Sequence, residues 1–184
     1  ATATLLGLGD LEVLEHLSAL ENVAGRFQYV VSKEGITAIV DYAHTPDALA
    51  NILDTIERIR TKNERLITVV GCGGDRDQGK RPLMGGIAAE KSDTIIFTSD
   101  NPRSENPSVI IEQMETGVSA SDIKKILVIE NRKQAIKTAC QLAGPKDIIL
   151  IAGKGHEDFQ EINGVRTPFS DFEIVKEHLT LLQE

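Results

Sequence analysis

Apolar residues gather in short runs that alternate with segments of helical periodicity. Runs of four or five mostly apolar residues, without the polar alternation of a half-buried strand, are typical of strands covered on both faces. They lie at 66–70, 94–98, 126–129 and 148–152. Amphipathic segments that predict helices lie at 45–60, 80–91, from 106 onward, at 131–143 and at 171–182. The alternation predicts a doubly wound, Rossmann-like α/β domain with a mostly parallel sheet.

Local signals mark the ends of these elements. Thr45 and Asn106 each precede a proline, which is the expected order of an N-cap and a first helical residue. The pair Asn163-Gly164 separates two β-like runs and predicts an antiparallel hairpin with a type I′ turn near the C-terminus. The hairpin strands are expected at 159–162 and 165–168.

The start of the chain has a different pattern. Leucines and a valine recur every third residue over 11–23, which predicts a helix. Two β-like runs follow at 27–31 and 36–40, with a turn at Glu34-Gly35 between them. We expect residues 1–24 to be the tail of a preceding unit and the domain proper to begin at residue 25.

Charge and composition narrow the class of protein. The 184 residues include 20 Lys and Arg against 28 Asp and Glu, so the net charge of -8 argues against nucleic acid or an anionic membrane as the main partner. Two cysteines, Cys72 and Cys140, are too few for a disulfide framework or a four-thiolate metal site. Nothing resembles a signal peptide or a long apolar span, so the expected location is the reducing cytoplasm.

Four clusters of polar and glycine residues follow the ends of predicted strands. They are DYAHTPD from Asp41, GCGGDRDQGKRP from Gly71, SDNPR from Ser99 and GKGHED from Gly153. Any one of them has the ordinary composition of a loop. In an open α/β sheet, however, ligands bind outside the carboxyl ends of the strands, where such loops converge. We therefore expect the four clusters to line one site.

The cluster from Gly71 is close to a phosphate-binding loop. It satisfies GxxxxGK up to Lys80, but Arg81 stands where a Ser or Thr would bind magnesium. Two aspartates within it would also place carboxylates beside the phosphates. Arg76 occupies the position of the last glycine of a dinucleotide fingerprint. The loop presents Arg76 either within a self-satisfied turn or as a receptor for a carboxylate.

The other clusters suggest two kinds of ligand. Arg103 adds a second guanidinium, and carboxylates and backbone carbonyls lie near it, a combination that suits a zwitterion such as a free amino acid. In the first cluster, Tyr42 and His44 could stack on a purine while Asp41 accepts from ribose hydroxyls. Half-buried packing of Tyr42 and a capping role for His44 are the alternatives. No Cys and His pattern has the spacing of a zinc site.

These motifs, with GRF from Gly25, occur in the order found in the Mur ligases of peptidoglycan synthesis. From residue 25 to 184 the sequence resembles the C-terminal domain of that family. Residues 1–24 resemble the end of the family's central ATPase domain, so the resemblance implies N-terminal and central domains in the same full-length protein. It also implies an ATP-dependent ligase that joins an amino acid to a nucleotide-linked peptide.

In the implied reaction, ATP with Mg²⁺ phosphorylates the terminal carboxylate of UDP-MurNAc-L-Ala-D-Glu, and the amine of the amino acid attacks the acyl phosphate. This domain would be a lid, with magnesium bound mainly by the central domain and no catalytic residue of its own. By resemblance, ATP would contact Arg26, Asp41 and His44. The amino acid, which the DNPR motif indicates to be meso-diaminopimelate, would contact Arg76, Asp100, Asn101, Arg103, Gly153 and Glu157.

Two alternatives remain open. One is a stand-alone module that binds an amino acid or a nucleotide, and the other is a ligase domain like that of folylpolyglutamate synthase. A complete GxxxxGK[ST] motif does not occur in the sequence. We therefore expect the chain by itself to be inactive as a ligase.

Overall fold

The computed structural model describes residues 25–61 and 63–181. Both the helix expected over 11–23 and the assignment of residues 1–24 to a preceding domain lie outside the described residues. Within the described part of the chain, no helix combines the length and apolar character needed to cross a membrane.

A six-stranded sheet forms the centre of the domain, in the order β1-β2-β6-β3-β4-β5. Its strands are β1 (Gln28–Val31), β2 (Thr37–Asp41), β3 (Leu66–Val70), β4 (Thr94–Phe97), β5 (Ile126–Val128) and β6 (Ile148–Ala152). β1 pairs antiparallel with β2 at one edge, and all other pairings are parallel. Every residue of β3 and β6 is buried, as their apolar runs predict.

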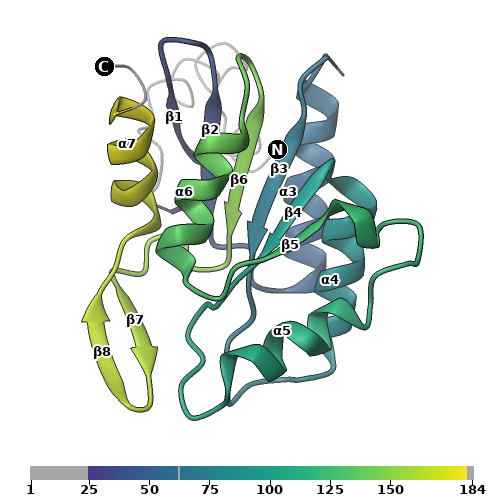
Figure 1. Cartoon of the computed structure of the whole chain (residues 1–184), viewed down its shortest axis with the longest axis vertical. Coiled ribbons are helices and arrows are strands. Elements are labelled where there is room, and N and C mark those ends of the chain that lie inside the picture. The colour runs from purple at the N-terminus through teal and green to yellow at the C-terminus, as the bar shows by residue number, and fades with distance from the viewer. Residues whose placement is uncertain (1–24, 62, 182–184) are drawn as a thin grey trace, which may run out of the picture.

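Helices cover both faces of the sheet (Figure 1). They are α3 (Pro46–Ile59), α4 (Lys80–Lys91), α5 (Pro107–Glu115), α6 (Arg132–Leu142) and α7 (Asp171–Leu181), with a short 3₁₀ turn at Ile123–Lys125. One apolar core joins α3, α4 and α5 to the sheet, and a second core joins α6 and α7 to the opposite face. The predicted doubly wound α/β architecture is confirmed.

The expected local signals are present at the element ends. The Thr45 hydroxyl accepts a hydrogen bond from the Ala48 amide at the start of α3, and the Asn106 side chain caps α5. A separate antiparallel pair consists of β7 (Phe159–Ile162) and β8 (Val165–Pro168). Both turn residues of this hairpin have positive φ, which the predicted type I′ turn requires. Most observed ends lie within one or two residues of those predicted.

The topology places a crevice between β6 and β3. After β3 the chain enters α4 on one face, whereas after β6 it continues through the hairpin into α7, which packs on the other face. The loops that leave these two strands therefore separate and leave space at the carboxyl edge of the sheet. This edge lies at the bottom of Figure 1.

Candidate functional site

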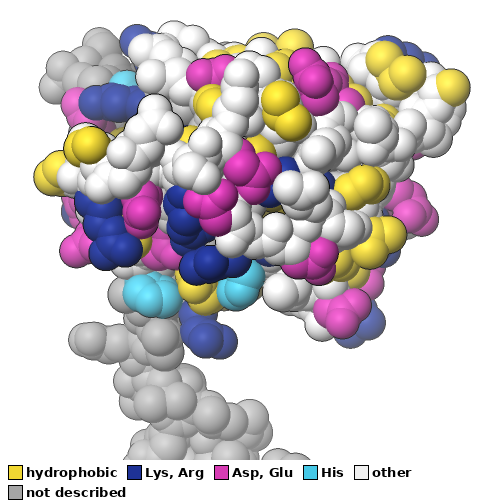
Figure 2. Space-filling view, turned by 90° about the horizontal axis from the view of Figure 1, so that it is seen from below, with side chains coloured by type: hydrophobic (Ala, Val, Ile, Leu, Met, Phe, Trp, Pro, Cys, Tyr) yellow, Lys and Arg dark blue, Asp and Glu magenta, His cyan; other side chains and the backbone are white. Residues whose placement is uncertain are grey.

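A cavity of about 500 Å³ opens at the carboxyl edge of the sheet. Figure 2 views the molecule from this side and shows acidic and basic side chains lying next to one another, with histidines beside them. The loops after β2, β3, β4 and β6 all contribute to the cavity, so the four polar clusters converge as predicted. Its lining consists of Tyr42, His44, Thr45, Gly71, Cys72, Gly73, Arg76, Asp77, Lys80, Asp100, Asn101, Arg103, Gly153 and Glu157.

Most of the residues predicted to bind ligands lie in this lining. All six residues expected to contact the amino acid are there, together with His44. Arg26 and Asp41 are outside the lining. Arg26 is exposed, and the Asp41 carboxylate accepts a hydrogen bond of 2.8 Å from the Phe27 amide, which connects the end of β2 to the start of the described chain.

Aromatic side chains form one wall of the cavity. The Tyr42 ring lies 4.5 Å from the His44 ring and 5.0 Å from the His156 ring, measured between centroids. The Nδ1 atom of His44 donates to the Tyr42 carbonyl at 2.9 Å, which fixes the orientation of an otherwise exposed imidazole. This wall offers flat ring surfaces of the kind on which a base can stack.

The loop from Gly71 to Lys80 is not a phosphate cradle. Three of its backbone amides donate within the protein: Gly74 to the Asn101 carbonyl, Asp75 to the Glu105 carboxylate and Gly79 to the Asp77 carboxylate. A P-loop instead directs such amides at the phosphates. The Lys80 ammonium donates to the His44 carbonyl at 2.7 Å and so connects the two sides of the cavity.

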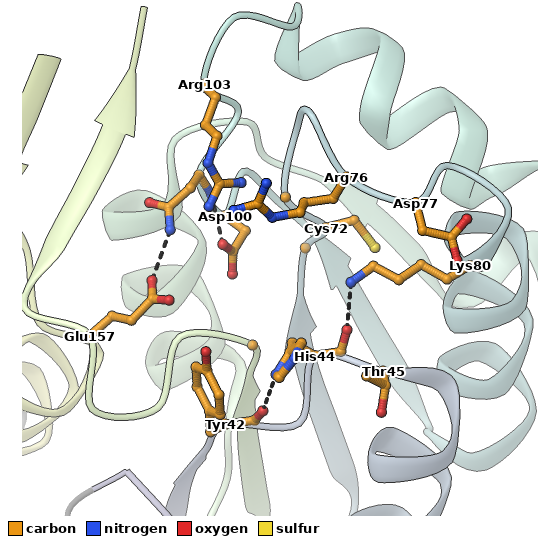
Figure 3. Close-up of a pocket in the computed structure, with 14 residues that line it drawn as sticks. Tyr42, His44, Thr45, Cys72, Arg76, Asp77, Lys80, Asp100, Arg103 and Glu157 are labelled. Atoms are coloured by element: carbon orange, nitrogen blue, oxygen red, sulfur yellow. Dashed lines mark hydrogen bonds between the residues drawn. The ribbon is translucent and has the colours of Figure 1, made fainter. Parts of the chain in front are cut away.

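Arg76 is not paired with the acids beside it in the sequence. Asp75 accepts from Ser104, and these bonds hold the pKa of Asp75 below its ordinary value. Asp77 accepts from the Gly79 amide. The Arg76 guanidinium donates to the Asp75 carbonyl at 3.1 Å and otherwise reaches into the cavity (Figure 3). Because Arg76 has no carboxylate partner in its own loop, this arrangement favours a role as receptor for a ligand carboxylate over a loop whose charges satisfy one another.

Arg103 extends from a different loop to the same place as Arg76 (Figure 3). Its Nη1 atom donates to the Gly74 carbonyl at 2.8 Å. Two guanidiniums that share one end of a cavity repel each other, and an anion between them relieves that repulsion. A carboxylate fits because its two oxygens match the planar fork of a guanidinium.

The hairpin holds the backbone of Arg103 in an unusual conformation. Its φ is +50°, in the left-handed region that costs a residue with a Cβ atom about 1 kcal/mol. The Arg103 amide donates to the Glu161 carbonyl at 3.1 Å, and the Asn163 amide donates to the Arg103 carbonyl at 2.7 Å. β7 thus positions the second arginine of the cavity without itself lining it.

Acidic and amide groups line the same cavity as the arginines. Asp100 is buried, which raises the pKa of its carboxyl group. Asn101 donates through Nδ2 to Glu157 Oε2 at 2.8 Å. Gly153 has a φ of +119°, and a Cβ atom at that position would lie 2.7 Å from the Asp100 carboxylate. Only glycine allows the loop after β6 to approach Asp100 this closely.

Two ion pairs behind the cavity, one partly buried and one fully buried, were not expected from the sequence. The Arg81 side chain, fully buried, donates to both oxygens of Glu105 at 2.8 Å and so joins α4 to the loop after β4. Arg132 and Asp171 join α6 to α7, with both side chains fully buried. Arginines on amphipathic helices resemble surface residues in the sequence, and only the tertiary packing pairs them.

Comparison with known proteins identifies the family. The family model described as "Mur ligase, glutamate ligase domain" matches residues 25–155. The chain is 56% identical over 182 residues to the UDP-N-acetylmuramoyl-L-alanyl-D-glutamate--2,6-diaminopimelate ligase of Cytophaga hutchinsonii, which covers 99% of this chain and 37% of that protein. The ligase of the same name from Bacteroides thetaiotaomicron is 55% identical, over 95% of this chain and 36% of that protein. The chain thus spans little more than a third of the length of these relatives.

Solved structures agree with this result. A structure of a UDP-N-acetylmuramoyl-L-alanyl-D-glutamate--2,6-diaminopimelate ligase superposes with a TM-score of 0.81 at 41% identity, over 100% of this chain and 37% of that one. The folylpolyglutamate synthase of Thermotoga maritima has a TM-score of 0.57 at 20% identity, over 94% of this chain and 34% of that one, and shares only the fold. The six-stranded sheet lies within residues 25–155, which the family model matches, and the chain belongs to the Mur ligase family.

Proposed function

We propose that this chain is the amino-acid-binding and ATP-covering domain of a ligase that adds meso-diaminopimelate to UDP-MurNAc-L-Ala-D-Glu with hydrolysis of ATP. The observation that carries the proposal is that Arg76 and Arg103 lie together at one end of the cavity, opposite the carboxylate of Glu157. Diaminopimelate has two carboxylates and two amines, so it offers anions to the arginines and a cation to the acid. The names of the most similar relatives support the same substrate.

In the proposed reaction the domain orients substrates, and the phosphoryl transfer occurs on a neighbouring domain. Mur ligases use ATP and Mg²⁺, but among the described residues no cluster of His, Cys, Asp and Glu has the makeup of a metal site. We assign magnesium binding mainly to the neighbouring domain. The exposed Arg26 and the Tyr42–His44 wall are assigned to ATP, and the six amino-acid contacts to the attacking substrate. Cys72 and Cys140 are free, buried thiols, which supports the expected cytoplasmic location.

The test is an amide-forming assay with ATP, UDP-MurNAc-L-Ala-D-Glu and either meso-diaminopimelate or lysine. We expect the longer ligase that contains this chain to form the tripeptide product with diaminopimelate and to release ADP and phosphate. The chain of 184 residues alone is expected to form no amide and to hydrolyse no ATP, because its GxxxxGK loop lacks the following Ser or Thr and three of its amides donate within the protein. ATP hydrolysis by the pure chain that depends on Lys80 would contradict the assignment of that loop.

The ATP assignment leads to a separate prediction for Asp41. Asp41 is the last residue of β2, directly before Tyr42 of the aromatic wall, and its carboxylate accepts from the Phe27 amide. If Asp41 also accepts from the ribose, Asp41→Ala in the longer ligase should raise KM for ATP roughly tenfold to a hundredfold, the effect of losing a charge-assisted hydrogen bond. KM for diaminopimelate should change much less. Asp47→Ala, which removes an exposed acid from the first turn of α3, is the matched control. An unchanged KM for ATP in a folded Asp41 variant would limit Asp41 to its structural bond.

A further inference from the structure

Lys154 is a buried cation next to the proposed amino-acid contacts. It lies in the loop after β6, and its side chain is fully buried. Its Nζ atom donates to Asn101 Oδ1 and to Glu157 Oε2, both at 2.9 Å, and lies 5.5 Å from the centre of the Phe159 ring. A buried ammonium group is costly unless it is paired in this way. The position of Lys154 beneath the cavity surface excludes direct contact with a ligand in this conformation.

The bonds of Lys154 close a triangle with its two partners. Asn101 receives the ammonium on Oδ1 and donates through Nδ2 to the same Glu157 oxygen that Lys154 contacts. The Glu161 amide also donates to Asn101 Oδ1, at 3.0 Å, so the hairpin fixes the amide group as well. Within the described part of the chain, the hydrogen bonds to the Glu157 side chain end on Oε2. This leaves Oε1 of a cavity-lining carboxylate for a ligand.

We propose that Lys154 is a positioning residue for the amino-acid substrate, acting through Glu157 and Asn101. This inference rests on the proposed function for its substrate, but the triangle itself is a property of the chain. Lys154 holds Glu157 in one orientation and in its ionised form, so that Oε1 can accept from the substrate ammonium. Without Lys154, the carboxylate would lose this fixed orientation and part of its charge stabilisation.

The charges around Glu157 explain how the ionised form persists. Burial of Glu157 raises the pKa of its carboxyl group, but the hydrogen bond and charge of Lys154, with help from Asn101 and Arg103, bring that pKa below its ordinary value. Two further charges interact with Glu157: Asp100 repels its carboxylate and Arg132 attracts it. Without the Lys154 ammonium, less charge stabilisation opposes the effect of burial on the Glu157 carboxyl group. The pKa of Glu157 should then rise.

Lys154→Met tests the proposal in the longer ligase, since methionine keeps the unbranched side chain and removes the charge. We expect KM for diaminopimelate to rise roughly tenfold to a hundredfold, while KM for ATP stays within about twofold. The acidic limb of the pH profile of kcat/KM for diaminopimelate, where protonation of Glu157 abolishes binding, should move to higher pH. Lys137→Met, at an exposed position on α6, removes the same charge and should leave both properties unchanged.

Two further measurements separate positioning from general stability. In a double-mutant cycle, Lys154→Met should add little to the defect of Glu157→Gln, because Lys154 acts through that carboxylate. Additive effects, or equal rises in KM for ATP and diaminopimelate, would overturn the proposal.

Carboxyl ¹³C NMR of the unmutated chain, which needs no substrate, should show Glu157 titrating below the ordinary glutamate range. Titration above that range would also overturn it. An unmutated ligase that rejects diaminopimelate would instead refute the proposed function and leave the NMR result standing.

Discussion

Replacing Arg103 with alanine in the longer ligase is expected to remove most activity with meso-diaminopimelate. Lysine and diaminopimelate share one α-carboxylate and two amines, and only diaminopimelate has a second carboxylate at its far end. If Arg103 binds this second carboxylate, its guanidinium gains a paired anion when diaminopimelate is bound. With lysine, the guanidinium would instead face an ammonium and remain unpaired. Discrimination by a polar group left without its partner reaches about 10⁴-fold, far more than a missing methylene in an apolar pocket gives.

The measurement is kcat/KM of the unmutated and Arg103→Ala ligases with both amino acids. The unmutated ligase should prefer diaminopimelate by up to about 10⁴-fold, and the variant should lose most of that preference. Both residues carry a Cβ atom, so the left-handed backbone at position 103 is equally strained in the two proteins. Arg58→Ala, which removes an exposed arginine from α3, is the control and should behave like the unmutated ligase.

A conservative variant distinguishes shape from charge at the same position. Arg103→Lys keeps the positive charge, but a compact ammonium cannot form the two parallel hydrogen bonds of a guanidinium. The bond from Arg103 Nη1 to the Gly74 carbonyl leaves other guanidinium N–H groups for a ligand, whereas a lysine would have to use its single nitrogen for both partners. We expect its activity with diaminopimelate to remain poor. Comparable kcat/KM values for lysine and diaminopimelate in the unmutated ligase would remove the role assigned to Arg103.

The position of the site could be predicted from the sequence because parallel strands constrain where loops meet. Each polar cluster begins at the end of an apolar run, and the carboxyl ends of such strands share one edge. That rule places Arg76, Arg103 and Glu157 together without any knowledge of their contacts, and the cavity contains all three. The hairpin turn at Asn163 could also be predicted, because few residue pairs suit two successive positive φ angles.

The contacts that shape the site depend on tertiary packing that no local pattern encodes. The left-handed backbone of Arg103 depends on β7, some 60 residues further along the chain, as the hydrogen bonds to Glu161 and Asn163 show. The Gly71 loop matches a phosphate-binding pattern in the sequence. Only the structure shows that three of its amides, those of Gly74, Asp75 and Gly79, donate to groups within the protein. Arg132 occupies an ordinary helical position in the sequence, yet its side chain is fully buried.

The buried pair of Arg132 and Asp171 connects the site to the stability of the domain. Arg132 donates to both Asp171 oxygens, at 2.8 and 2.7 Å, and to the Ala152 carbonyl at 3.0 Å. Ala152 is the last residue of β6 and precedes Gly153 in the cavity wall. One guanidinium therefore joins α6, α7 and the strand that presents the loop. Loss of either charge would leave the other buried without its partner.

Arg132→Met is expected to lower the free energy of unfolding of the chain by about 3–5 kcal/mol at pH 7, the usual cost of breaking a buried ion pair by removing one partner. Arg132 also opposes the rise in the pKa of Asp100 caused by burial, so in the variant that pKa should rise further. A carboxyl group whose pKa is higher in the folded state than in the unfolded state costs stability as pH rises through that interval. The loss caused by Arg132→Met should therefore be larger at pH 7 than at a pH below the ordinary aspartate pKa, where Asp100 is protonated in both the folded and the unfolded state.

Urea unfolding of the 184-residue chain, followed by circular dichroism, measures these differences. The double variant Arg132→Met with Asp171→Leu replaces both charges with apolar groups and should recover most of the lost stability, because neither residue then leaves an unpaired charge. Lys137→Met on the exposed side of α6 should change stability by no more than about 0.5 kcal/mol. A single variant within about 1 kcal/mol of the unmutated chain, or a double variant less stable than Arg132→Met alone, would contradict the view that this pair joins α6, α7 and β6 behind the cavity.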